Sequence, residues 1–145
     1  VARDSGHICN IASAGGLIAN PRMSVYAASK WAAIGWSDSV RVELQDRRSK
    51  VRITTVAPYY ITTGMFDGVR SPIIPLLKPE KAAREIIKAI ERNTNFRCLM
   101  PLIPLAYHFT RLMQGLLPSP VFDWLFGRVV GIYHTMDNFT GRKNA

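Results

Sequence analysis

The sequence has few cysteines and no spacing of cysteine and histidine that is typical of a metal site. With only 2 cysteines in 145 residues, we expect no disulfide framework, and a reducing compartment is favoured. There is no run of about 20 apolar residues, which a membrane-spanning helix needs, and no glycine-rich phosphate loop. With 48% hydrophobic and 20% charged residues, the chain is not a disordered tail, and one hydrophobic core is expected.

Acidic residues are also scarce. The chain has 10 Asp and Glu against 19 Lys and Arg, and this formal net charge of +9 favours anionic partners. Nucleic acid, phospholipid headgroups and a phosphate-bearing cofactor all suit that charge, which by itself does not separate them. No nucleic-acid-binding motif accompanies the charge, so we expect no nucleic-acid partner.

What the sequence does contain is an alternation of strand and helix patterns. Short apolar or β-branched runs bounded by turn residues predict strands, and a long Ala-rich run without proline predicts the longest helix. The predicted strands are residues 7–11, which we expect to be buried, 51–57 and 97–100, and the predicted helices are residues 24–46 and 79–93. Asn10 at the end of the first strand is expected to hydrogen-bond locally, and Gly35 inside the long helix is expected to mark close packing. This order predicts a parallel sheet with right-handed crossovers. The long connection 59–78 has the length of a lid or a binding loop.

The last third of the chain has the pattern of two amphipathic helices separated by Pro118-Ser119-Pro120. Ser119 is predicted to cap the second helix, with Pro120 at its first position. Helices of this kind usually cover the core of their own chain or of a partner subunit. The alternatives are that they form a lid over a lipidic substrate or that they bind peripherally to a membrane surface.

Three polar residues near the first predicted strand and the long helix have the chemistry of a catalytic site. Tyr26 and Lys30 are four positions apart, so a helix projects both from one face, and Ser13 follows the strand. A cation about 4 Å from a phenol stabilises the ionised form by at most about 4 kcal/mol at an effective dielectric of about 20. Tyr26 would then act as a general acid/base near neutral pH, with the Ser13 hydroxyl donating to a substrate oxygen. Neither residue carries a hydride, so a redox cofactor is required.

Ser13, Tyr26 and Lys30 at this spacing resemble the catalytic half of the short-chain dehydrogenase/reductase family. The Ala-rich helix and the following strand, which ends at Pro58, fit the same pattern. Residues 58–64, Pro-Tyr-Tyr-Ile-Thr-Thr-Gly, are similar to the Pro-Gly loop of that family. Tyr59 replaces the usual glycine, as in the branch of retinol and 17-beta-hydroxysteroid dehydrogenase-like proteins. The resemblance covers about residues 5 to 100.

The resemblance implies a catalytic role for each of the three residues. Tyr26 is the acid/base, and Ser13 orients the substrate oxygen. Lys30 favours the ionised form of Tyr26 and also holds the nicotinamide ribose hydroxyls. The implied reaction interconverts an alcohol and a carbonyl by hydride transfer on an apolar substrate that resembles a lipid, a retinoid or a steroid.

The resemblance also implies a site for NAD or NADP, to which Tyr26 and Lys30 contribute. Its other residues are in the loop: Pro58, Ile61, whose backbone lies beside the nicotinamide carboxamide, and Thr63, which contacts the carboxamide or the phosphates. Thr62 is adjacent to Thr63, and either threonine could face the ligand. No residue is assigned to a metal.

The implied fold is α/β: the carboxy-terminal part of a Rossmann-type doubly wound parallel sheet with amphipathic C-terminal helices. Residues 1–101 are interpreted as the catalytic half of that domain, without its amino-terminal nucleotide-binding half, and residues 102–145 as a helical extension. We expect this stretch alone to be inactive, and the full-length protein to be a cytoplasmic homo-oligomer, with peripheral membrane contact through the C-terminal helices as an option. The alternative function is a catalytically idle scaffold that binds lipid or a membrane surface.

Overall fold

A computed structural model describes residues 3–71, 74–99 and 106–140. Its centre is a three-stranded parallel sheet in the order β1-β2-β3, with β1 at His7–Ile11, β2 at Arg52–Pro58 and β3 at Phe96–Leu99. The α/β fold with a parallel sheet is therefore confirmed. The strand bounds agree with the prediction to within one residue, except that Met100, predicted to end the third strand, lies outside the described residues.

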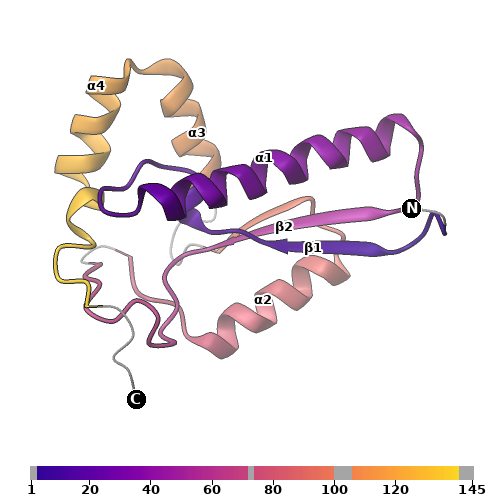
Figure 1. Ribbon diagram of the computed structural model, residues 1–145, viewed down its shortest axis with the longest axis horizontal. Coiled ribbons are helices and arrows are strands. Elements are labelled where there is room, and N and C mark those ends of the chain that lie inside the picture. Colours follow the sequence, from indigo (N-terminus) through magenta and orange to yellow (C-terminus); the bar gives the residue numbers. More distant parts are fainter. Residues whose placement is uncertain (1–2, 72–73, 100–105, 141–145) are drawn as a thin grey trace.

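Two helices cover opposite faces of the sheet (Figure 1). Helix α1 spans Ser24–Asp46 and α2 spans Pro79–Glu91, close to the predicted bounds. Neighbouring residues of β2 pack on opposite faces of the sheet. Ala57 clusters with Ile34 of α1, whereas Val56 clusters with Ala89 of α2. The strand is buried on both sides, and for this reason its sequence is almost continuously apolar or β-branched.

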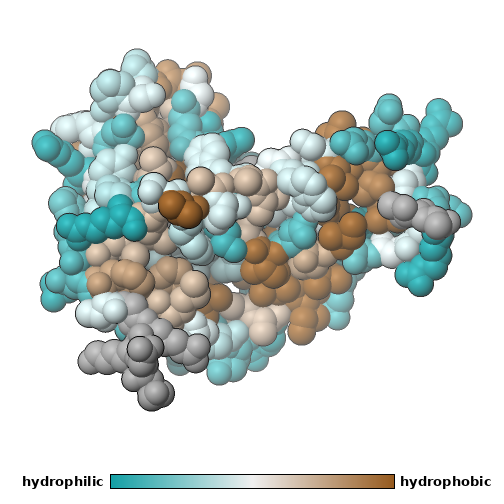
Figure 2. All heavy atoms as spheres, viewed as in Figure 1, coloured by the Kyte–Doolittle hydropathy of each residue, from teal (hydrophilic) through white to brown (hydrophobic). Residues whose placement is uncertain are grey.

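Strand β1 differs from its prediction as a buried strand. Ile8 is 36% exposed and Ile11 is 47% exposed. Within the described residues β1 pairs only with β2, so its other edge has no neighbouring strand to cover it. Figure 2 shows apolar side chains gathered on the face between α1 and α2, where β1 runs (Figure 1).

Close contacts hold α1 against the end of β1. Asn10 of β1 donates from Nδ2 to Oγ of the buried Ser37 at 2.8 Å, although the sequence had favoured a local partner for Asn10. Gly16 is buried against the Lys30 backbone, where an added Cβ would lie 2.7 Å from the carbonyl carbon. Gly35, expected from sequence to mark close packing, has no atom within 4 Å of such a Cβ. The close approach is thus at Gly16.

The C-terminal third packs beside the carboxyl ends of the strands. Helices α3 (Ala106–Leu116) and α4 (Ser119–Phe122) are followed by a π-helix, η2 (Asp123–Val129), and a 3₁₀ turn, η3 (Ile132–His134) (Figure 1). Phe122 and Phe126 stack at 4.4 Å between ring centroids and join the core. The predicted Ser119 cap is wrong: the chain turns into α4 at Pro118, which makes no side-chain cap bond, and Ser119 is already helical. No described helix combines the length and apolar character needed to cross a membrane.

Candidate active site

All six residues singled out from the sequence line one cavity of about 280 Å³. The cavity lies where β1 and β2 end, at the carboxyl edge of the sheet, which is where open α/β sheets bind ligands. Residues from three elements converge there: the turn after β1, the first two turns of α1, and the loop after β2. The six are Ser13, Tyr26, Lys30, Pro58, Ile61 and Thr63.

Ser13 and Tyr26 converge over Gly15. Ser13 precedes the 3₁₀ turn η1 (Ala14–Gly16), and its Oγ accepts a hydrogen bond from the Gly15 N–H at 3.1 Å. A Cβ on Gly15 would lie 3.5 Å from Ser13 Oγ and 3.4 Å from Cε1 of the Tyr26 ring. The hydroxyl of Ser13 and the ring of Tyr26 are therefore neighbours across a residue that has no side chain.

Lys30 lies one helical turn after Tyr26 and faces the same cavity. Its Nζ is 5.5 Å from the centroid of the Tyr26 ring, within the range of a cation–π contact. The same Nζ donates a long hydrogen bond, 3.5 Å, to the Ile11 carbonyl at the end of β1. The expected placement of an ammonium beside the phenol ring is what the helix geometry produces.

The loop after β2 separates the two adjacent threonines. The backbone N–H and Oγ1 of Thr62 both bond to the Leu77 carbonyl, at 2.9 and 3.3 Å, while Thr63 lines the cavity. Of the two, Thr63 is therefore the one that lines the cavity. Tyr59 also lines the cavity, and its hydroxyl bonds to Ser71 Oγ at 2.7 Å. Burial raises the pKa of Tyr59, so its phenol stays protonated at neutral pH.

The cavity also includes residues that sequence reasoning missed. Phe66 makes edge-to-face contacts with Tyr26, at 6.1 Å and 81°, and with Tyr60, at 5.1 Å and 72°. Thr135, far along the chain, supplies a buried polar side chain. The length of the loop after β2 was the only signal for Phe66, and no local pattern pointed to Thr135. Most of the remaining lining is apolar: Ile11, Ala12, Ala14, Ile18, Met23, Met65 and Ile74.

Within residues 3–71, 74–99 and 106–140, no three His, Cys, Asp or Glu side chains come together as a metal site would require. The polar groups of the cavity are instead hydroxyls, one ammonium and one amide. Fold and site together define a class: a Rossmann-type α/β protein with a Ser-Tyr-Lys set at the carboxyl edge of its sheet.

Comparison with known proteins agrees with this class. A family model described as short chain dehydrogenase matches residues 1–73, half of the chain. The chain therefore belongs to the short-chain dehydrogenase family. It is 34% identical to mouse epidermal retinol dehydrogenase 2 over 147 aligned residues, which cover 99% of this chain and 46% of that protein. It is 32% identical to human retinol dehydrogenase 10, over 78% of this chain and 34% of that protein.

Solved structures show the same likeness. A short chain dehydrogenase from Burkholderia cenocepacia, in complex with NADP, superimposes with a TM-score of 0.56 and 27% identity, over 79% of this chain and 48% of that one. A short chain dehydrogenase/reductase from Burkholderia phymatum, in complex with NAD, shares the fold at a TM-score of 0.57 and 20% identity, covering 79% of this chain and 50% of that one. The matches thus cover between 34% and 50% of the length of these relatives.

Proposed function

We propose that the protein to which this chain belongs is an NAD(P)-dependent oxidoreductase that interconverts an alcohol and a carbonyl on an apolar substrate. The observation that supports it most directly is the convergence of Ser13, Tyr26 and Lys30 on one cavity. The family membership and the names of the relatives, both retinol dehydrogenases, point to the same chemistry.

In this proposal Tyr26 moves the proton. Its phenol donates to the developing alkoxide when a carbonyl is reduced and accepts the proton when an alcohol is oxidised. The ammonium of Lys30, 5.5 Å from the ring centroid, places a positive charge beside the ring of Tyr26. Ser13 holds the same substrate oxygen by a hydrogen bond, which stabilises the charge that develops there.

The groups around the cavity fit a nicotinamide cofactor. A cation at Lys30 and a hydroxyl at Thr63 offer donors for ribose, carboxamide or phosphate oxygens, and Ile61 also lines the cavity. When bound, this cofactor supplies or accepts the hydride. Pro58 ends β2 at the edge of the cavity and leads directly into the loop that contains Ile61 and Thr63.

The apolar lining supports a lipid-like substrate. Most of the lining residues are apolar, and a few polar groups would fix the orientation of a substrate, as is usual for small-molecule pockets. The relatives named for retinol are consistent with an apolar alcohol. Retinoid, steroid and long-chain alcohols are therefore the substrates to test first.

The test is nicotinamide absorbance at 340 nm with the full-length protein and a panel of those alcohols and their carbonyl forms. Tyr26→Phe should lower kcat by about 10²- to 10⁴-fold, the usual contribution of a positioned acid/base. Tyr133→Phe is the matched control, because it removes a phenol hydroxyl that bonds to Asp123 and is not part of the cavity lining. Unchanged turnover in Tyr26→Phe would refute the mechanism.

A second candidate function, contact with a membrane surface, is supported by α3. Phe109, Leu112 and Leu116 share one face of this helix and are 54%, 56% and 66% exposed. An apolar stripe on a protein of net charge +9 suits a bilayer that contains anionic lipid. In liposome flotation, the double variant Leu112→Glu/Leu116→Glu should lose binding, whereas Val42→Glu, at a 54% exposed position of α1, should keep it. Equal binding by both variants would remove α3 from this role.

A further inference from the structure

Phe66, in the loop after β2, contacts the residue that we propose moves the proton. Its ring lies edge-to-face against the ring of Tyr26, with 6.1 Å between the ring centroids and 81° between the ring planes. Both residues line the cavity, although they come from different elements. Edge-to-face packing is a preferred arrangement of aromatic pairs and restricts the angle between the two rings. Phe66 is therefore placed where it can set the orientation of Tyr26.

The orientation of Tyr26 depends on contacts to its ring, because its hydroxyl makes no hydrogen bond within the part of the chain that the structure describes. The turn at Gly15 borders the ring, where an added Cβ would lie 3.4 Å from Cε1. The ammonium of Lys30 is 5.5 Å from the ring centroid, at the end of a long side chain with much rotamer freedom. Phenylalanine has only two side-chain torsions, so Phe66 restrains the ring more firmly than the ammonium does.

The C-terminal segment, residues 135–140, in turn holds Phe66. Phe139 packs against the Phe66 ring with 6.3 Å between the centroids. Thr140 donates two hydrogen bonds to the carbonyl of Asp67, the residue after Phe66, from its N–H at 3.0 Å and from Oγ1 at 3.2 Å. Both the side chain and the neighbouring backbone of Phe66 are therefore in contact with this segment.

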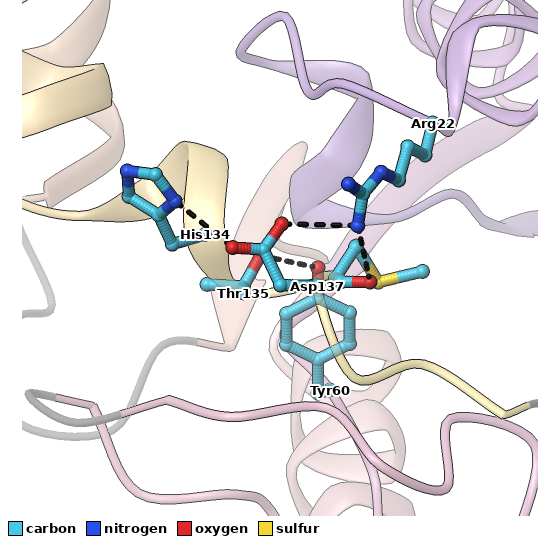
Figure 3. Close-up of polar contacts among 6 residues, drawn as sticks. Arg22, Tyr60, His134, Thr135 and Asp137 are labelled. Carbon is cyan, nitrogen blue, oxygen red and sulfur yellow. Dashed lines mark hydrogen bonds and ion pairs between the residues drawn. The ribbon is translucent and has the colours of Figure 1, made fainter.

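The C-terminal segment is itself fixed to both sides of the cavity. Asp137 pairs with Arg22, in the loop before α1, at 3.0 Å (Figure 3). The Tyr60 hydroxyl, in the loop after β2, lies 3.3 Å from Thr135 Oγ1 (Figure 3), and the Tyr60 ring contacts Phe66 edge-to-face at 5.1 Å and 72°. Contacts from several directions thus hold Phe66 in one place, as a residue that orients a reacting group requires.

We infer that Phe66 is a positioning residue of this active site. It holds the ring of Tyr26, and with it the hydroxyl, in the orientation that directs the proton to the substrate oxygen, and the C-terminal segment keeps Phe66 there. Phe139, which is not part of the cavity lining, then affects proton transfer only through Phe66. This inference rests on the proposed function, since it concerns the residue that would move the proton.

The kinetic test uses the full-length protein and the alcohol that it oxidises fastest. Phe66→Leu keeps an apolar side chain but removes the ring, and should lower kcat about twofold to tenfold, the range of one aromatic pair. Phe66→Tyr keeps the ring and should restore kcat. Trp124→Leu is the control and should leave kcat unchanged, because it removes a ring that is 58% exposed and is not part of the cavity lining.

Phe139→Leu separates positioning from direct contact with the substrate. Since Phe139 is not part of the cavity lining, this variant should lower kcat and leave KM unchanged. The double variant Phe66→Leu/Phe139→Leu should lower kcat no further than Phe66→Leu alone, because both substitutions act on the same contact. Additive losses would overturn the inference. If Phe66→Leu does not fold, Phe139→Leu takes its place, since Phe139 is 43% exposed.

NMR of protein with ¹³C-labelled tyrosine rings gives a readout that needs no turnover. The signal that is lost in Tyr26→Phe identifies Tyr26, and its chemical shift senses the ring current of a neighbouring aromatic side chain. Phe66→Leu and Phe139→Leu should both move this signal, whereas Trp124→Leu should not.

The two measurements distinguish the inference from the proposed function. Absence of turnover, together with a Tyr26 signal that moves in Phe66→Leu and Phe139→Leu, would refute the oxidoreductase proposal and support the placement of Tyr26 by Phe66. Turnover that Tyr26→Phe lowers but Phe66→Leu leaves unchanged, or a Tyr26 signal that does not move in Phe66→Leu, would overturn the positioning role alone.

Discussion

Gly16→Ala is expected to destabilise the protein by moving α1 away from the turn after β1. A Cβ at this position would lie 2.7 Å from the carbonyl carbon of Lys30, 2.8 Å from its oxygen and 3.0 Å from Cδ1 of Ile34. Two of these atoms belong to the backbone of α1, so a side-chain rotation cannot relieve the overlap. Inserting a methyl group into a packed site of this kind costs about 1–3 kcal/mol.

Gly35→Ala is the matched substitution in the same region. Gly35 is in the interior of α1, and an added Cβ there meets no atom within 4 Å. Because alanine favours a helix over glycine by up to about 1 kcal/mol, this variant should be more stable than the unaltered protein. The two variants make the same chemical change and are predicted to shift stability in opposite directions.

Urea unfolding followed by circular dichroism at 222 nm measures both effects as changes in the free energy of unfolding. Gly16→Ala should also lower kcat, because the displaced segment of α1 includes Lys30. If Gly16→Ala proved as stable as Gly35→Ala, the close contact between the turn and the Lys30 backbone would be refuted.

Two other predictions concern the loop after β2 and α2. Gly68→Ala should loosen the C-terminal segment, because φ is +84° at Gly68 and a Cβ would lie 1.9 Å from the Asn138 carbonyl oxygen; limited proteolysis should cleave this variant faster, and equal cleavage would contradict the contact. Hydrogen bonds from Lys88 and Arg97 lower the pKa of Glu85. The stability from this carboxylate is therefore present above the unfolded-state pKa of about 4.3 and is lost as the pH falls through the lower folded-state pKa. Glu85→Gln should reduce the free energy of unfolding at pH 7 by at most about 1 kcal/mol, since the pairs are partly exposed. A difference that persisted in acid would exclude this cause.

The elements of the fold were predictable because each follows from a local pattern. The Ala-rich run without proline became α1 with the predicted bounds, and the β-branched run before Pro58 became β2, shifted by one residue from its prediction. The end of α2 followed from Asn93, which adopts φ +52°, a left-handed conformation that asparagine tolerates at a helix end. The predictions of close packing at Gly35 and of burial for β1 were wrong, because packing and burial depend on which residues are neighbours in space.

Sequence spacing alone placed Tyr26 and Lys30 on one face of a helix, because helical periodicity is a property of the backbone. Ser13 was singled out because it follows the first strand, and Thr63 only through the resemblance to the family's Pro-Gly loop. Only the tertiary structure decided that Thr63 rather than Thr62 faces the cavity, since the choice depends on the Leu77 carbonyl. The same holds for Tyr60, whose partners Asn20 and Thr135 are 40 and 75 positions away. Contacts between such distant positions are set by chain packing, and no local pattern encodes them.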